Sequence, residues 1–174
     1  MIRPLLIASA ASLALAACAT SGDMGGGTAA AGDMTPNDRS AYVQMAAASD
    51  LFEIQSSQLA VSRAQNPEVR AFAQMLIEHH TATTRQLTAA ASAVGTPSRP
   101  MLMPMQADMI ARLQGANGAA FDRLYMRQQV PAHQMALALH QNYARNGDTP
   151  SLQAVAASAV PIVRQHLERA RTPR

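Results

Sequence analysis

Lysine and tryptophan are absent from the chain, and cysteine, tyrosine and phenylalanine are scarce. All 14 basic residues among the 174 are arginines, which excludes reactions that need a lysine nucleophile or a Schiff base. Aromatic residues make up 3% and hydrophobic residues 48%, a composition that favours closely packed helices over a β-sandwich. The acids are interspersed with the arginines and the net charge is only +3, so no nucleic-acid surface is expected. The length and composition predict one all-α domain.

The single cysteine, Cys18, ends an N-terminal segment that is typical of a bacterial lipoprotein. Arg3 supplies a positive charge, residues 5–17 are apolar, and the letters LAAC place small residues directly before the cysteine. We therefore predict a lipoprotein signal peptide over residues 1–17 and a lipid on Cys18. The apolar run is shorter than the roughly 20 residues of a transmembrane helix. A lipidated Cys18 would leave no free thiol for disulfides, catalysis or metal binding.

Residues 18–36 are rich in glycine and alanine and have no hydrophobic periodicity, which predicts a flexible tether after the lipid. Ala19 follows the cysteine, where an aspartate would resemble an inner-membrane retention signal. By analogy with other lipoproteins, we expect the protein in the cell envelope, anchored to the outer membrane and facing the periplasm. The membrane is the one partner that the sequence predicts.

Residues 37–172 carry the signals of four long helices and one short helix. Asn66 suits an N-cap, Pro67 suits the first helical position, and Gly95 and Gly147 suit helix ends. Because only the connection between the second and third long helices is long, the pattern predicts a four-helix bundle with a crossover. The expected long helices cover residues 37–64, 67–94, 118–146 and 150–170, with a short helix at 106–113 in the crossover.

Each long helix carries one polar group near its middle, which is the main functional clue. His80 lies on an unbroken apolar seam with alternating spacings of three and four, and His166 lies on a similar seam. His79 lies about 100° from that seam, so we expect it at the bundle edge or in solvent. His133 belongs to a polar stripe, and Glu53 lies among small residues. Antiparallel packing would place Glu53, His80, His133 and His166 at a similar depth.

Burying these groups without partners would cost a few kcal/mol each, so we expect each of them to have a partner, which two arrangements can supply. One is a single divalent transition metal ion (Fe, Zn, Mn, Ni or Cu) with Glu53, His80, His133 and His166 as ligands. The other is a metal-free hydrogen-bond network. Asp122 is also expected to tie down the start of its helix. The residues expected to support the cluster from the polar stripe of the third long helix are Asp122, Gln129 and His140.

Four methionines gather in the crossover, at positions 101, 103, 105 and 109. Thioethers are soft ligands that hold Cu(I), which makes this segment a second candidate for metal binding. Methionine also fills irregular gaps in a core, and that interpretation needs no metal. Both interpretations stay open from the sequence.

Four stretches, FAQMLIEHH, AAFDRLYM, QQVPAH and VPIVRQHLERAR, resemble the landmarks of a bacterial envelope family, the domain of unknown function 4142. Members of this family are often labelled outer-membrane proteins and are placed among ferritin-like folds. The resemblance covers residues 38–171 and implies a ferritin-like four-helix bundle in the envelope, with no activity attached. The positions that match the family pattern are Glu53, His80, Asp122, His133 and His166.

The sequence lacks carboxylates that the di-iron site of the ferritins requires. Ile77 and Val163 stand three residues before His80 and His166, where a Glu-x-x-His pair would have glutamates. A bound metal would therefore be mononuclear. A hydrolase is not expected, because no nucleophile elbow accompanies Ser56. The sequence predicts a lipid-anchored protein of metal handling or stress protection, or alternatively a structural or interaction module of the envelope.

Overall fold

Five helices and no strand make up residues 35–172, the part of the chain that the computed structural model describes. The all-α expectation is confirmed over these residues, and every helix end lies within two residues of its predicted position. The predicted signal peptide, Cys18 and almost all of the predicted tether lie outside the described residues. The helices are α1 (Arg39–Arg63), α2 (Pro67–Ala93), α3 (Pro104–Gly115), α4 (Gly118–Asn146) and α5 (Pro150–Arg171).

Local chemistry explains where α1 and α2 begin and end. The Asp38 carboxylate accepts the N–H of Ala41, and the Asn66 side chain accepts the N–H of Glu68, so both helices start at a side-chain cap. At the end of α2, Gly95 has a φ of 70°, which few residues other than glycine adopt. The N–H groups of Gly95 and Thr96 then bond back to the last turn of α2, which closes the helix with a Schellman motif.

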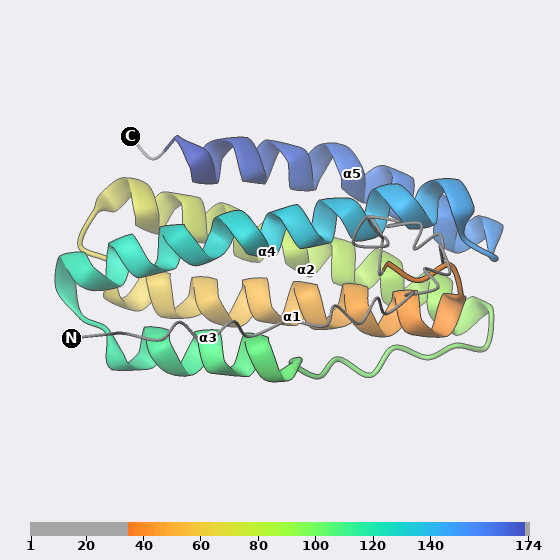
Figure 1. The fold of residues 1–174 in the computed structure, drawn as a ribbon, viewed down its shortest axis with the longest axis horizontal. Helices are drawn as coiled ribbons and strands as arrows, with labels where there is room; N and C mark the ends of the chain where they lie inside the picture. Colours follow the sequence, from red (N-terminus) through yellow and green to blue (C-terminus); the bar gives the residue numbers. More distant parts are fainter. Residues whose placement is uncertain (1–34, 173–174) are drawn as a thin grey trace, which may run out of the picture. The chain divides into compact units, whose positions relative to one another are not determined.

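The four long helices lie side by side and run antiparallel to their neighbours (Figure 1). α1 packs along α2 and α4 packs along α5, and the two pairs meet through α1 with α4 and α2 with α5. The chain between α2 and α4 returns along the outside, where α3 packs against α1 and α4 (Figure 1). Among the described helices, none is both long and apolar enough to cross a membrane.

Two apolar clusters fill the two ends of the bundle, and a polar layer separates them. Tyr42, Leu87 and Tyr143 belong to the first apolar cluster, and Phe72 and Phe121 belong to the second. α1 begins in the first apolar cluster, passes through buried polar residues and ends in the second cluster. α2 and α4 begin in the second cluster, pass through buried polar residues and end in the first. The buried polar residues of the layer are Asp50, Glu53, Ser56, Ser57, His80, Gln128, Gln129, His133 and His166.

Candidate metal centre

Three histidines from three helices meet inside the polar layer. His80 lies on α2, His133 on α4 and His166 on α5, and each residue is at most 2% exposed. One ring nitrogen of each histidine lies within 4.8 Å of those of the other two. The structure thus brings together the three histidines that the seam analysis placed at one depth.

Each of these imidazoles uses one ring nitrogen to bond a neighbour. A carboxylate or a backbone carbonyl can only accept, so His80 and His133 donate from Nδ1. The partners of the three rings differ: one is a carboxylate, one is a carbonyl and one is another imidazole. The bonds are His80 Nδ1 to Asp50 Oδ1 at 2.8 Å, His133 Nδ1 to Gln129 O at 2.9 Å, and His166 Nε2 with His79 Nδ1 at 2.8 Å.

The second ring nitrogen of each imidazole has no hydrogen-bond partner among the described residues. These atoms are His80 Nε2, His133 Nε2 and His166 Nδ1, and all three are buried. A buried polar atom without a partner costs about 1–3 kcal/mol, and native proteins contain few of them. Three such atoms on three converging rings therefore point to a shared ligand.

Asp50 is the strongest partner of the cluster, and sequence reasoning missed it. It is 6% exposed, and its carboxylate accepts the hydroxyls of Thr83 and Thr84 in addition to the His80 ring. The signal was its position three residues before Glu53, which puts both carboxyl groups on one face of α1. Burial alone would lower the pKa of His80, but the hydrogen bond and charge of Asp50 outweigh it and raise that pKa.

Glu53 is buried beside the histidines, but it lies outside the group of ligand atoms within 4.8 Å. Its Oε1 is 3.6 Å from His133 Nδ1, too long for a hydrogen bond, and neither carboxyl oxygen has a partner among the described residues. Burial raises the pKa of Glu53 to about 8 and lowers that of His133 to about 3. At neutral pH the two groups are therefore a carboxylic acid beside a neutral imidazole, and not an ion pair.

His79 lies at the bundle edge, one of the two positions expected for it, and from there it also takes part in the site. It is half-buried at the bundle edge, where its ring stacks on His166 with centroids 5.1 Å apart. Burial and, to a smaller extent, the neighbouring imidazoles together lower the pKa of His166 to about 2. His166 is therefore neutral, and which of its nitrogens carries the proton depends on the bond with His79.

The three residues expected to support the cluster have different positions. Gln129 supports it directly, because its carbonyl accepts from His133 and its amide donates to Ser56 at 3.3 Å. His140 lies next to the first apolar cluster, where its Nδ1 bonds the Tyr42 hydroxyl at 3.1 Å. Asp122 accepts the backbone N–H groups of Gln65 and Asn66, so it ties the start of α4 to the turn between α1 and α2.

The donor set fits a transition metal ion. Neutral imidazoles suit Zn(II), Cu(II), Fe(II) and Ni(II), and their outer N–H groups are bound by a carboxylate and a carbonyl, as in known metal centres. Three protein ligands leave a coordination position free on an ion that prefers four. The Ser56 hydroxyl donates to the Glu53 carbonyl and not to a histidine, so no nucleophile and base pair forms here.

These features define an all-helical bundle protein with three histidines converging in a buried polar layer. The chain belongs to the family described as "Domain of unknown function (DUF4142)", which matches residues 24–172. The resemblance of the four stretches to this family is thereby confirmed. Comparison with curated protein sequences gives no match.

Solved structures share the fold at low sequence identity. CopM in the Cu(II)-bound form is 19% identical, with a TM-score of 0.67 over 79% of this chain and 95% of that chain. CopM in the Cu(I)-bound form is also 19% identical, with a TM-score of 0.62 over 76% and 91%. A DUF305 fragment from Deinococcus radiodurans is 20% identical, with a TM-score of 0.66 over 75% and 90%. At these identities the likeness concerns the fold alone.

Proposed function

We propose that the protein binds one divalent transition metal ion through His80, His133 and His166. Two observations carry this proposal: one ring nitrogen of each histidine lies within 4.8 Å of those of the other two, and each ring has a buried nitrogen that lacks a partner among the described residues. The opposite nitrogens are fixed by Asp50, Gln129 and His79. An ion would satisfy all three free nitrogens at once, whereas a fourth protein group that does so is not present in the described cluster.

The proposal requires one tautomer of His166. If His79 Nδ1 accepts, His166 Nε2 carries the proton and His166 Nδ1 has a free lone pair for the metal. In the reverse arrangement His166 Nδ1 carries the proton and cannot bind an ion. Metal binding would therefore select the form in which His166 donates to His79, which makes His79 the residue that orients this ligand.

The ligand set favours Zn(II) or Cu(II) as the ion. Three imidazoles without a bridging carboxylate form a mononuclear site, as expected from Ile77 and Val163 at the positions before His80 and His166. Glu53 is then an acid beside the site, and its ionisation would offset the charge of the ion. Copper is a reasonable first ion to test, because CopM, which shares the fold, is described in a Cu(II)-bound form.

We propose the ferritin-like four-helix bundle as the finer description of the fold. The ring of contacts from α1 to α2, α5 and α4 supports it, as does the crossover that contains α3. The location stays a proposal that rests on the sequence: a lipid on Cys18 would hold the bundle to the outer membrane, facing the periplasm. The role would then be metal handling or stress protection in the envelope.

Metal analysis of the protein purified without chelator tests the proposed centre. We would express residues 19–174 in a bacterial periplasm and compare the wild type with His80→Ala and with His140→Gln, a buried histidine outside the cluster. Near-stoichiometric metal that is lost only in His80→Ala supports the centre. Added Zn(II) or Cu(II) should also raise the melting temperature of the wild type. Absence of metal and of stabilisation would leave the cluster as a structural hydrogen-bond network.

A further inference from the structure

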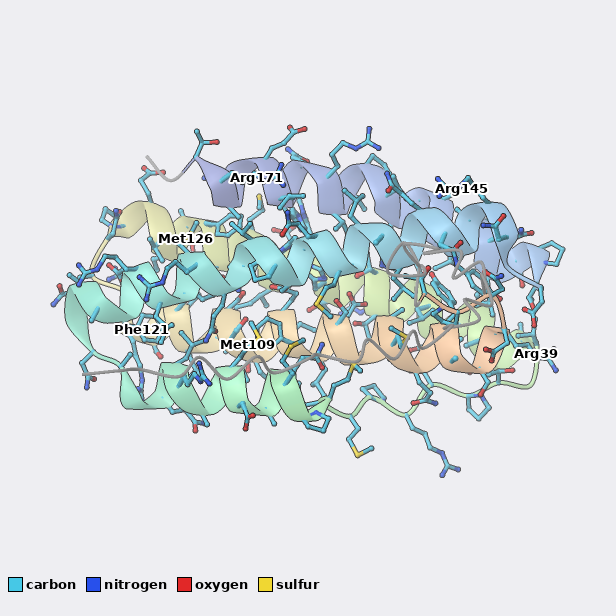
Figure 2. All side chains as sticks on the ribbon, viewed as in Figure 1. Arg39, Met109, Phe121, Met126, Arg145 and Arg171 are labelled. Atoms are coloured by element: carbon cyan, nitrogen blue, oxygen red, sulfur yellow. The ribbon has the colours of Figure 1, made fainter. Side chains whose placement is uncertain are left out.

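A second group of possible ligands lies on the outside of the bundle, where α3 packs against α1 and α4. A pocket of about 110 Å³ opens there between the three helices. Figure 2 labels Met109 on the side of α3 that faces α1. Five of the residues that line the pocket are methionines, from three different elements: Met45, Met103, Met105, Met109 and Met135.

The helical spacing directs these side chains into one space. Met45 on α1 shares a face with Ser49, one turn further on, and Met135 on α4 shares a face with Ala132. Ser49 and Ala132 are small, so they leave room beneath the longer thioether side chains. Two of the five methionines, Met105 and Met109, are one turn apart on α3 and lie on the same face.

Polar bonds fix the backbone that carries the α3 methionines. The Met103 N–H donates to the Gln106 side chain at 2.8 Å, which defines the start of α3. The Gln128 side chain of α4 donates to the Met109 carbonyl at 3.1 Å, which ties α3 to α4. The thioethers are therefore presented from a fixed segment, and a ligand would not have to order it.

The distribution of methionine argues against simple filling of a core. Among the described residues, the exposed large hydrophobic residues are all methionines, and three of the four line this pocket: Met103, Met105 and Met135, at 37%, 50% and 47% exposure. The largest fully buried side chains are Tyr, Phe, Leu, His and Gln, and none is a methionine. A gap filler would be buried, and a merely apolar surface would be served by leucine equally well. The shared feature of the exposed positions is sulfur.

The residues that line the pocket favour an ion that is both soft and of low charge. Thioethers are soft neutral ligands that favour Cu(I), and the lining residues include no carboxylate, histidine or arginine. A divalent ion would therefore be poorly compensated there, whereas a monovalent ion costs less to desolvate. We propose that this methionine pocket binds one soft monovalent ion, Cu(I) or Ag(I), through several thioethers. The site is separate from the histidine cluster and does not depend on it.

Silver titration of the full chain carrying Cys18→Ser tests the proposal, because Ag(I) does not need a reducing agent and the substitution removes the thiol that would compete for it. With methionine methyl groups labelled by ¹³C, Ag(I) should shift the signals of the five pocket methionines and leave that of Met126, in the second apolar cluster, in place. Calorimetry would measure the affinity of a variant with leucine at positions 103, 105, 109 and 135. Leucine keeps the apolar volume and removes the sulfur, so this variant should lose about tenfold or more in Ag(I) affinity.

Two further variants separate the possible outcomes. Met126→Leu should keep the wild-type Ag(I) affinity, and His80→Ala should keep the Ag(I)-induced shifts of the pocket methionines. The leucine variant should in turn keep Zn(II) binding at the histidine cluster, so the two sites can fail independently. Unchanged Ag(I) affinity in the folded leucine variant would overturn the proposal, as would shifts confined to methionines outside the pocket. If the leucine variant does not fold, the methyl shifts of the wild type decide the question.

Discussion

At the scale of single residues, Asp50 carries the most consequential contact of the histidine cluster. Its bond to His80 Nδ1 fixes the orientation of the ring and leaves Nε2 as the nitrogen without a partner, and its charge makes the ring a better ligand. Asp50→Asn keeps the shape and removes the charge, so we expect metal affinity to fall by about 10- to 100-fold. Calorimetric titration with Zn(II) measures this, with Asp108→Asn, an exposed site on α3, as the control. Equal affinities in the two variants would contradict the role of Asp50.

Glu53 should make metal binding release protons. Its pKa is raised to about 8 by burial, so the carboxyl group is mostly protonated at pH 7. A divalent ion bound by the neighbouring histidines would favour the carboxylate and lower that pKa, so the proton should leave when the ion binds. We expect Glu53→Gln to release about one proton fewer than the wild type at pH 7. Titrations in buffers of different ionisation enthalpy count these protons, and an identical count in both proteins would remove Glu53 from the site.

At the scale of helices, the end of α4 depends on a close approach that only glycine allows. A Cβ added at Gly147 would lie 2.6 Å from the Tyr143 carbonyl oxygen and 2.6 Å from its ring. That ring stacks on Tyr42 with centroids 3.8 Å apart, so it cannot move away freely. We expect Gly147→Ala to lower the free energy of unfolding by about 1–3 kcal/mol in urea titrations.

Gly115→Ala is the matched control, because a Cβ there meets nothing within 4 Å. Because Gly115 is the last residue of α3, we expect Gly115→Ala to leave the free energy of unfolding unchanged or to raise it slightly. A loss at position 115 equal to that at 147 would show that contact with Tyr143 is not the cause of the loss.

The helices were predictable from the sequence because their ends depend on local signals. Asn66, Pro67 and Gly95 act within one turn of the chain, and the structure uses them as expected. His80, His133 and His166 were found because a spacing of three and four identifies the inward face of a single helix. Whether a flanking residue meets the next helix depends on how that helix is rotated, and the sequence does not determine this rotation. Asp50 and His79, which lie on such flanks, therefore required the structure.

At the scale of the whole molecule, the buried polar layer should give the metal-free protein a stability maximum near pH 6.5. Burial lowers the pKa values of His133, His140 and His166 to about 3, 4 and 2, from 6.5. Below pH 6.5 the unfolded chain therefore binds protons at these histidines that the folded protein does not, and stability falls as pH falls. Glu53 acts in the opposite direction, but one carboxyl group offsets only one of the three histidines.

Above pH 6.5 we expect stability to fall as pH rises, because the groups with raised pKa values, Glu53 and His80, now determine its pH dependence. Between about pH 4.5 and about pH 8 the folded protein keeps the Glu53 proton that the unfolded chain has released, so its stabilising effect is lost as pH rises. The raised pKa of His80 acts in the same sense. Urea midpoints measured with chelator from pH 4.5 to 8.5 should therefore peak near pH 6.5, and Glu53→Gln should weaken the decline on the alkaline side. Stability that continues to rise from pH 6.5 to 8 would show that Glu53 is ionised in the folded bundle, and the acid proposed beside the metal centre would have to be abandoned.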